Sequence, residues 1–218
     1  MTFSIIGIDR KAGEIGIATA TKAIACGAIV PFAKSGVGGV ATQSYPNVLY
    51  KEKAISLLEK RMKPTSVIKL LVKNDNRKEM RQVIVMNSAG ESAGFTGEGN
   101  VDFAGHISGK GFICAGNMLA SRNVLDAVSR SFLKSKGSLA GRLINSLIAG
   151  DKIGGDKRDK PYGSASLFIV KNNKGPLGIG DRWIDLRIDY SFTPISDLKR
   201  LLKERMKVDN FYSARYRY

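Results

Sequence analysis

The chain has few of the residues that build metal sites and disulfide scaffolds. Its 218 residues include two cysteines, Cys26 and Cys114, and one histidine, His106. The two cysteines lie far apart in the sequence, whereas zinc-binding cysteines come in pairs about two to four residues apart. A single histidine excludes a site built from several histidines. We therefore expect no metal, no cofactor and no disulfide scaffold.

Long apolar runs are also absent. No stretch of about 18 uncharged apolar residues is present to cross a bilayer. The start of the chain lacks the basic, apolar and small-residue pattern of a signal peptide. These absences predict a cytoplasmic protein with no membrane partner. With 24 glycines and only 6 prolines, the composition also excludes collagen-like and proline-rich architectures.

Acidic residues are scarce relative to basic ones. The chain has 19 Asp and Glu against 35 Lys and Arg, a net charge of +16. Such an excess is typical of proteins that bind polyanions. Residues 51–81 carry ten basic and four acidic side chains, but their helical spacing is explained by a solvated helix face. Aromatic and Arg residues alternate over residues 211–218 and could stack on bases. Because no nucleic-acid-binding motif accompanies them, nucleic-acid binding stays an alternative interpretation.

The order of expected elements predicts one layered domain. Strands are expected at residues 3–8, 14–20, 28–33, 36–42, 81–86, 91–95, 101–106, 112–115, 164–170 and 183–190, and helices at 46–60, 64–73, 121–134, 138–148 and 194–207. Hairpins that alternate with helix pairs indicate an α+β fold with mostly antiparallel sheets. We expect a single domain over residues 1–207 and a basic, aromatic tail over residues 208–218.

Thr2 is the most informative residue for chemistry. A small second residue allows the initiator methionine to be removed, which would leave Thr2 as the first residue. Its hydroxyl would then be a nucleophile, and its own α-amine, with a reference pKa of about 8, could act as the base. This mechanism needs no histidine. A Met-Thr start is also common without any function, but here a strand follows at once and would fix the terminus.

Two further residues are predicted to assist Thr2. Lys34 lies between an apolar run and a glycine-rich segment, where a half-buried ammonium could stabilise negative charge on a nearby hydroxyl. Asn117 follows Gly116 just before an expected helix, and its amide and the local backbone N–H groups could bind an oxyanion. Their alternatives are an exposed turn lysine and a structural turn with a helix cap.

Three residues are predicted to bind substrate. Asp156 and Arg158 lie in a loop that opens with two glycines, and Arg158 is suited to a carboxylate or phosphate. His106, which follows Gly105, completes the set. A solvated loop and a hydrogen-bonded structural histidine are the alternatives for these residues.

Eight short blocks of the sequence resemble, in order, the domain-of-unknown-function family 1028. They are Thr2-Phe3-Ser4-Ile5, Gly36-Val37-Gly38-Gly39-Val40-Ala41-Thr42-Gln43, Arg81-Gln82-Val83, Phe95-Thr96-Gly97, Ala104-Gly105-His106, Ala115-Gly116-Asn117-Met118-Leu119, Gly154-Gly155-Asp156-Lys157-Arg158 and Asp185-Leu186-Arg187-Ile188-Asp189. Members of that family look like N-terminal nucleophile (Ntn) hydrolases. The resemblance covers residues 2 to about 205.

The resemblance implies a four-layer αββα sandwich related to the proteasome β-subunit. In that superfamily a terminal Thr, Ser or Cys attacks an amide; Thr2 matches that position, and Lys34 falls at the spacing of the proteasome's lysine. The sequence departs from the pattern in three places, one of which is the basic tail after about Lys207, which has no counterpart in the family. Thr19-Ala20-Thr21 stand where proteasomes carry an aspartate, and residues 159–164 replace the Gly-x-Gln-Ser that follows the Gly154–Arg158 block in the family.

The sequence thus supports three hypotheses. The first is an amide hydrolase with Thr2 as the nucleophile and a small-molecule amide or a peptide as the substrate. The second is a non-catalytic module on the same fold that binds a small molecule or a protein, and the third is a basic protein associated with nucleic acid. A homo-oligomer is compatible with each of them.

Overall fold

Ten strands form two sheets in residues 2–216, the part of the chain that the computed structural model describes, without the side chains of residue 177 and residues 209–216. The larger sheet has the order β10-β9-β2-β1-β8-β7 and the smaller one β3-β4-β5-β6. The strands are β1 (Thr2–Asp9), β2 (Glu14–Thr21), β3 (Pro31–Lys34), β4 (Gly38–Ser44), β5 (Arg81–Asn87), β6 (Ser92–Thr96), β7 (Gly105–Gly109), β8 (Phe112–Asn117), β9 (Gly163–Lys171) and β10 (Arg182–Ser191). Neighbouring strands pair antiparallel. The expected α+β fold with antiparallel sheets is confirmed.

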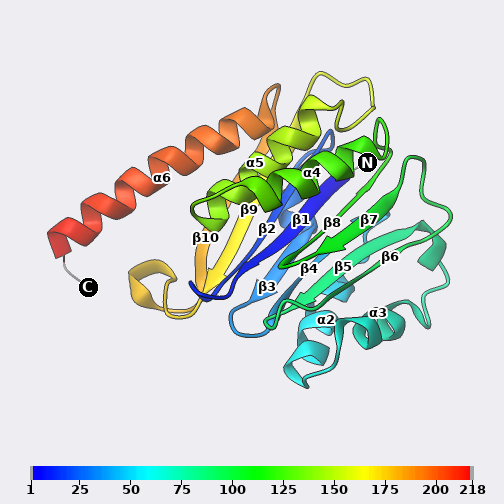
Figure 1. Cartoon of the computed structure of the whole chain (residues 1–218), viewed down its shortest axis with the longest axis horizontal. Helices are drawn as coiled ribbons and strands as arrows, with labels where there is room; N and C mark the ends of the chain where they lie inside the picture. The colour runs from blue at the N-terminus through cyan, green and yellow to red at the C-terminus, as the bar shows by residue number, and fades with distance from the viewer. Residues whose placement is uncertain (1, 217–218) are drawn as a thin grey trace.

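Helices lie along the outer face of each sheet (Figure 1). The larger sheet carries α4 (Asn123–Lys134), α5 (Leu139–Lys152) and α6 (Pro194–Tyr216), and the smaller sheet carries α2 (Leu49–Glu59) and α3 (Pro64–Val72). A short helix, α1 (Cys26–Ile29), connects β2 to β3. Local sequence sets where helices begin. Pro64 occupies the first turn of α3, where a missing N–H costs nothing, and the Ser138 hydroxyl accepts a hydrogen bond from Gly141 N at the start of α5.

Three apolar clusters hold these layers together. One lies between the larger sheet and its helices and includes Phe3, Ile5 and Phe132. A second lies between the two sheets and is formed by side chains such as Ile6 and Ile84. The third lies between the smaller sheet and its helices. Because successive strand residues point to opposite faces, β1 contributes its odd-numbered residues to the first cluster and its even-numbered residues to the second.

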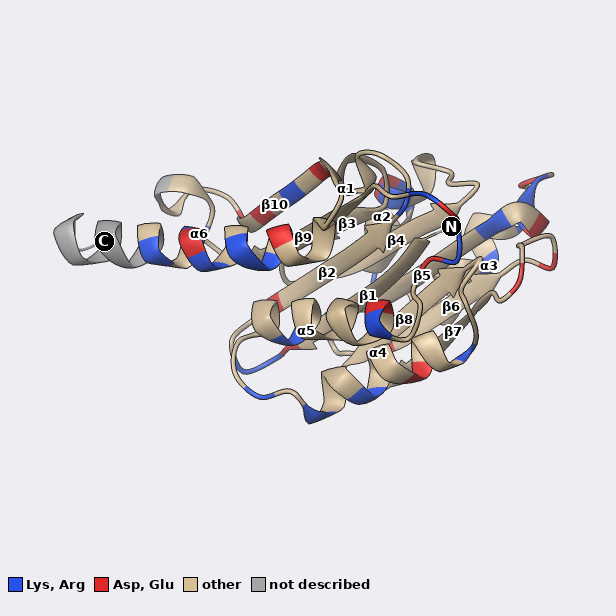
Figure 2. Ribbon diagram, turned by 90° about the horizontal axis from the view of Figure 1, so that it is seen from above, with Lys and Arg blue, Asp and Glu red and all other residues tan. Residues whose placement is uncertain are grey.

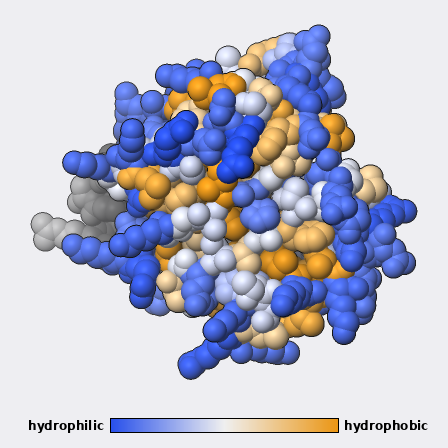
Figure 3. Space-filling model, turned by 45° about the vertical axis from the view of Figure 1, so that its right-hand side comes forward, coloured by the Kyte–Doolittle hydropathy of each residue, from blue (hydrophilic) through white to orange (hydrophobic). Residues whose placement is uncertain are grey.

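Charge is concentrated in the outer layers. Figure 2 shows Lys and Arg along the helices and loops, whereas the strands other than β10 carry few charges. On the face seen in Figure 3, apolar residues appear in several areas that polar side chains separate. No helix in the described part of the chain has the length and hydropathy to cross a membrane. The excess of Lys and Arg therefore lies on the surface of the molecule and not in the layer between the sheets.

Three expected elements differ in the structure. Residues 28–29 end α1, so the strand expected at 28–33 begins only at Pro31. The strand expected at 101–106 begins at Gly105, because residues 101–104 form a loop before it. The last helix does not end at Lys207 but continues to Tyr216. Most of the segment expected as a tail is therefore helical, and residues 217–218 lie outside the described part.

Candidate functional site

The layer between the sheets changes from apolar to polar along each strand that forms it. On β1, Thr2 and Ser4 share a face with Ile6 and Ile8, which belong to the inter-sheet cluster. The same change occurs on the other strands, where alternation places further polar residues on the inner face. We call the resulting set the polar end: Thr2, Ser4, Thr19, Thr21, Gln43, Gln82 and Asn117. Each of these residues is at most 8% exposed.

Thr2 is hydrogen-bonded through both its side chain and its carbonyl group. Its hydroxyl donates to Thr21 Oγ1 over 3.3 Å, and its carbonyl oxygen accepts from Gln43 Nε2 over 3.3 Å. Thr21 Oγ1 also accepts from Arg158 Nη2 at 3.1 Å. The Thr2 hydroxyl is therefore separated from a guanidinium by one side-chain oxygen. Met1 lies outside the described residues.

Gln82 is the centre of the hydrogen bonds at the polar end. Its Nε2 donates to the carbonyl oxygens of Gly105 and Gly116, at 3.0 and 2.8 Å, which fixes the orientation of the amide. Its Oε1 accepts from Gln43 Nε2 at 2.8 Å and from Asn117 Nδ2 at 2.9 Å. The side chain is fully buried. Gln82 thus joins strands of both sheets through one carboxamide.

Asn117 lies directly beside Thr2. The two residues are cross-strand partners in the β1–β8 register, and Asn117 is 1% exposed. Its Nδ2 carries two hydrogens, of which one bonds to Gln82 Oε1. The structure therefore brings Asn117 to Thr2, as the sequence predicts, in a fixed orientation.

Asp156 and Arg158 reach the same end of the sheet from a loop. Asp156 forms an isolated β-bridge with Leu119, just after β8, and its Oδ2 accepts from Lys22 N at 2.8 Å. The Arg158 guanidinium binds Asp156 in two places, with Nη2 2.7 Å from Oδ2 and Nε 3.1 Å from Oδ1. Bidentate pairing of this kind fixes the orientation of the guanidinium. It points Arg158 toward Thr21, next to Thr2.

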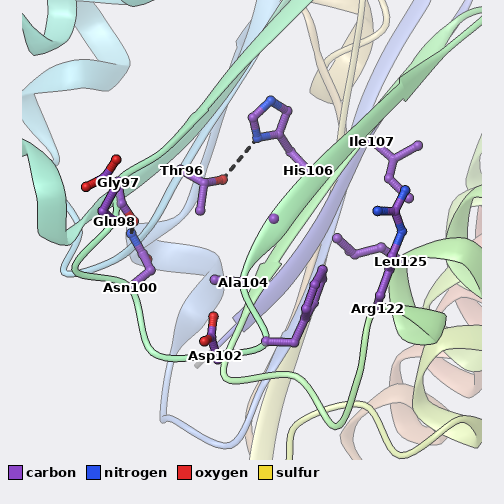
Figure 4. Close-up of a pocket in the computed structure, with 12 residues that line it drawn as sticks. Thr96, Gly97, Glu98, Asn100, Asp102, Ala104, His106, Ile107, Arg122 and Leu125 are labelled. Carbon is purple, nitrogen blue, oxygen red and sulfur yellow. Dashed lines mark hydrogen bonds between the residues drawn. The ribbon is translucent and has the colours of Figure 1, made fainter.

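His106 is linked to this set through Thr96. Its Nδ1 lies 3.0 Å from Thr96 Oγ1 (Figure 4), which accepts a hydrogen bond from Gln82 Nε2. Either atom of this pair can be the donor, depending on the tautomer of the ring. Partial burial lowers the pKa of His106, which favours the neutral ring. His106 thus lies at the edge of the polar end, in the wall of a cavity.

The structure does not bring Lys34 to Thr2. Lys34 pairs with Gly38 at one end of β4, whereas Gln43, which contacts Thr2, lies near the other end. The Lys34 ammonium is exposed and forms an ion pair with Glu59 Oε1 at 2.5 Å. That carboxylate raises the pKa of Lys34 and keeps the side chain charged, but the ammonium is paired with Glu59 and does not reach Thr2. The expected side-by-side arrangement of Thr2 and Lys34 fails because β3 runs away from the polar end.

Sequence reasoning missed Gln43, Gln82 and Thr21 as members of the site. A signal for them was present. On β5, Gln82 shares its face with the buried residues Ile84 and Met86, so alternation alone places a carboxamide on a buried face of the strand. A buried carboxamide needs several partners. The identity of those partners depends on how the two sheets face each other.

Comparison with known proteins places the chain in a family. The model of a family of unknown function, DUF1028, matches residues 2–198. The chain belongs to this family. A solved DUF1028 structure, of a protein from Silicibacter pomeroyi, superposes with a TM-score of 0.84 at 29% sequence identity, over 93% of this chain and 88% of the other. This DUF1028 protein therefore shares its fold with a solved member of the family.

Two other comparisons add no functional information. Anbu, the ancestral β-subunit from Yersinia bercovieri, aligns over 97% of this chain and 96% of its own, with a TM-score of 0.41 and 12% identity. A superposition that low carries no argument. None of the curated proteins matches the chain.

Proposed function

We propose that this DUF1028 protein is an amide hydrolase of the Ntn type, with Thr2 as its nucleophile after removal of Met1. The observation that carries the proposal is the position of Thr2. It is the first residue of a central strand, at the polar end of the layer between two sheets that helices cover. That arrangement supports the αββα sandwich that the family resemblance implies. A free Thr2 would present its hydroxyl and its amine on one rigid residue.

The described contacts supply a role for each neighbour. The Thr2 amine takes the proton of the hydroxyl as Oγ1 attacks the amide carbon. The positive charge of Arg158, transmitted through the Thr21 hydroxyl, favours the developing alkoxide. Asn117, with one amide hydrogen not used by Gln82, stabilises the oxyanion. The proton then moves to the leaving nitrogen as the C–N bond breaks, and water hydrolyses the resulting ester.

Asp156 and Arg158 form the substrate-binding edge of this site. Asp156 is buried by the loop and holds the guanidinium, so it acts as a positioning residue for Arg158. Arg158 is partly exposed, and its guanidinium can donate hydrogen bonds to a carboxylate or an amide oxygen of the substrate.

Two measurements test the proposal. Intact mass of the native protein should show that Met1 is absent, and an acylating probe should label the chain once, at Thr2. Thr2→Ala should abolish labelling, a loss of at least about a thousandfold in rate.

Ser4→Ala is the matched control, because Ser4 lies on the same face of β1 and is also buried and hydrogen-bonded. It should keep the labelling. A native protein that retains Met1, or equal labelling of Thr2→Ala, would contradict the proposal and favour a non-catalytic binding module.

A further inference from the structure

A groove of about 750 Å³ lies between α6 and β10, the strand at one edge of the larger sheet. Both elements lie on the side of the molecule away from β7 (Figures 1 and 2). Among the described strands, β10 pairs with β9 alone. One wall of the groove comes from the end of β10 and the turn after it, and the other wall comes from α6. This side of the molecule therefore presents a helix next to an unpaired strand edge.

Large apolar side chains are exposed along this groove. Phe192 is 67% exposed, Tyr190 53% and Leu201 36%, and all three line it. Tyr190 packs against Phe192 and stacks on Tyr162, with ring centroids 5.9 and 5.2 Å apart. Val208, further along α6, is 47% exposed. Exposed aromatic and aliphatic side chains that gather in one place are typical of a protein–protein interface.

Four charged residues lie beside these apolar groups, on one side of α6. Asp197, Arg200, Glu204 and Lys207 are spaced by three, four and three residues, which places them along one side of a helix. Their signs alternate, as the red and blue segments of α6 show in Figure 2. Within the chain Arg200 pairs with Asp197, and Lys207 pairs with Glu204. This charge stripe is therefore neutral, although the chain has a net charge of +16.

The order of charges in the stripe is complementary to the same order read backwards. When a second α6 helix runs antiparallel to the first and crosses it at the level of residue 202, residue 200 lies opposite 204 and residue 197 lies opposite 207. Arg200 then faces Glu204, and Asp197 faces Lys207. Each pair occurs twice, because both copies of a two-fold interface use the same surface. A parallel helix in the same register would instead place like charges opposite each other.

We propose that the chain forms a symmetric homodimer in which α6 packs antiparallel against α6 of a second copy. Leu201, one residue from the crossing point, then meets Leu201 of the second copy. Val208 meets the first turn of the other α6, next to Phe192. The reversed charge order is what selects a second copy as the occupant, since an unrelated partner would not require it. The dimer does not depend on any chemistry at Thr2.

The other side of α6 is unsuited to the same role. The groove between α5 and α6 is lined by Lys199, Arg200 and Lys203 and by no acidic residue. Two copies of a chain with a net charge of +16 would repel each other there. The charges therefore favour the side of α6 that carries the stripe.

Sedimentation equilibrium of the full chain measures the association directly. We expect the mass of a dimer that dissociates on dilution. Phe192→Ser should weaken the dimer, because it removes apolar surface beside the contact of Val208. A chain that stays monomeric up to its solubility limit would overturn the proposal.

Charge reversals test the arrangement of the helices. Arg200→Glu and Glu204→Arg each turn both central pairs into like-charge pairs, and each should raise the dimer dissociation constant about ten- to a hundredfold. The two variants change the net charge in opposite directions, so a general charge effect would act on them with opposite signs. Arg130→Glu, at an exposed position of α4, is the matched control and should leave the constant unchanged.

Two combinations should restore the dimer. The double variant Arg200→Glu/Glu204→Arg again pairs opposite signs and should return to within about threefold of the native dissociation constant. An equimolar mixture of the two single variants should form a heterodimer, because one carries two negative and the other two positive side chains at residues 200 and 204. Single variants that dimerise like the native chain, or a double variant and a mixture that both stay monomeric, would overturn the proposal. Restoration in either combination also shows that the single variants are folded.

Discussion

The two halves of the inter-sheet layer differ in chemistry but not in burial. On β5, Gln82 and Ile84 lie two residues apart on the same face, and both are 0% exposed. Ile84 packs among apolar side chains, whereas Gln82 hydrogen-bonds to groups on both sheets. An apolar side chain is stable wherever it excludes water. A buried carboxamide is stable only where every partner is in place.

This difference indicates which part of the chain carries residues for a function and not for folding alone. Continuing the apolar pattern of Ile6 and Ile8 to the start of β1 would satisfy packing without a hydrogen-bond network. The chain instead places hydroxyls and carboxamides there, on the same faces of the same strands. Departures from a consistent packing pattern are expected at functional sites. The comparison therefore supports locating the site at the polar end.

The largest expected effect on stability comes from replacing a carboxamide of the polar end by an apolar side chain, as in the apolar half of the inter-sheet layer. Gln82→Leu should destabilise the protein by about 3–5 kcal/mol, because it leaves the amides of Gln43 and Asn117 without their shared acceptor. Ile84→Leu is the matched change on the same strand face and should cost less than about 1.5 kcal/mol. Urea unfolding of the two variants measures the difference. Equal losses of stability would show that the polar end is packed like the apolar half and does not depend on its hydrogen bonds.

A smaller effect is expected from one hydroxyl pair. Ser4 Oγ and Thr19 Oγ1 lie 3.0 Å apart. A double-mutant cycle of Ser4→Ala and Thr19→Val should give a coupling free energy of about 0.5–1.5 kcal/mol. A second cycle pairs Ser4→Ala with Ile15→Val, which lies in the apolar half of β2, and should give a coupling free energy within about 0.5 kcal/mol of zero. Coupling of similar size in both cycles would remove the distinction between the halves.

The smallest expected effect is a pH dependence at the edge of the polar end. Burial lowers the pKa of His106 from its usual value of 6.5. The unfolded chain therefore binds this proton more readily than the folded one. The free energy of unfolding has its full value above about pH 6.5 and decreases as the pH drops below it. An NMR titration of the single imidazole should give a pKa below 6.5. His106→Gln should remove this part of the pH dependence, and a pKa at or above 6.5 would contradict the assignment.

Local patterns predicted the strands and helices where hydrophobic periodicity was clear. The hairpin of β1 and β2 matches the expected ranges almost residue for residue, because two short runs rich in apolar and β-branched residues flank a turn at Gly13 with φ of 70°. The strand expected at 101–106 failed in its first half. Val101 is apolar but exposed, and the neighbouring loop contributes the wall of a cavity instead.

The candidate site was predicted in part. Thr2, Asn117, Asp156 and Arg158 come together because β1 pairs with β8 and a loop returns to the end of β2. His106 joins them through Thr96. Lys34 does not, because the direction in which β3 leaves the polar end is set by the packing of the two sheets. Its position in the sequence carried no information on that direction.

The sequence by itself determined which side chains share a face of each strand. Alternation along a strand is local, so it puts Thr2, Gln82 and Asn117 on the same strand faces as residues of the inter-sheet apolar cluster. Only the tertiary structure decided which of these polar groups meet. The Gln43–Gln82 and Gln82–Asn117 hydrogen bonds join residues that are distant in the chain and that lie on three strands of two different sheets. A hydrogen bond depends on distance and direction between its two groups, and those are fixed only when the sheets pack.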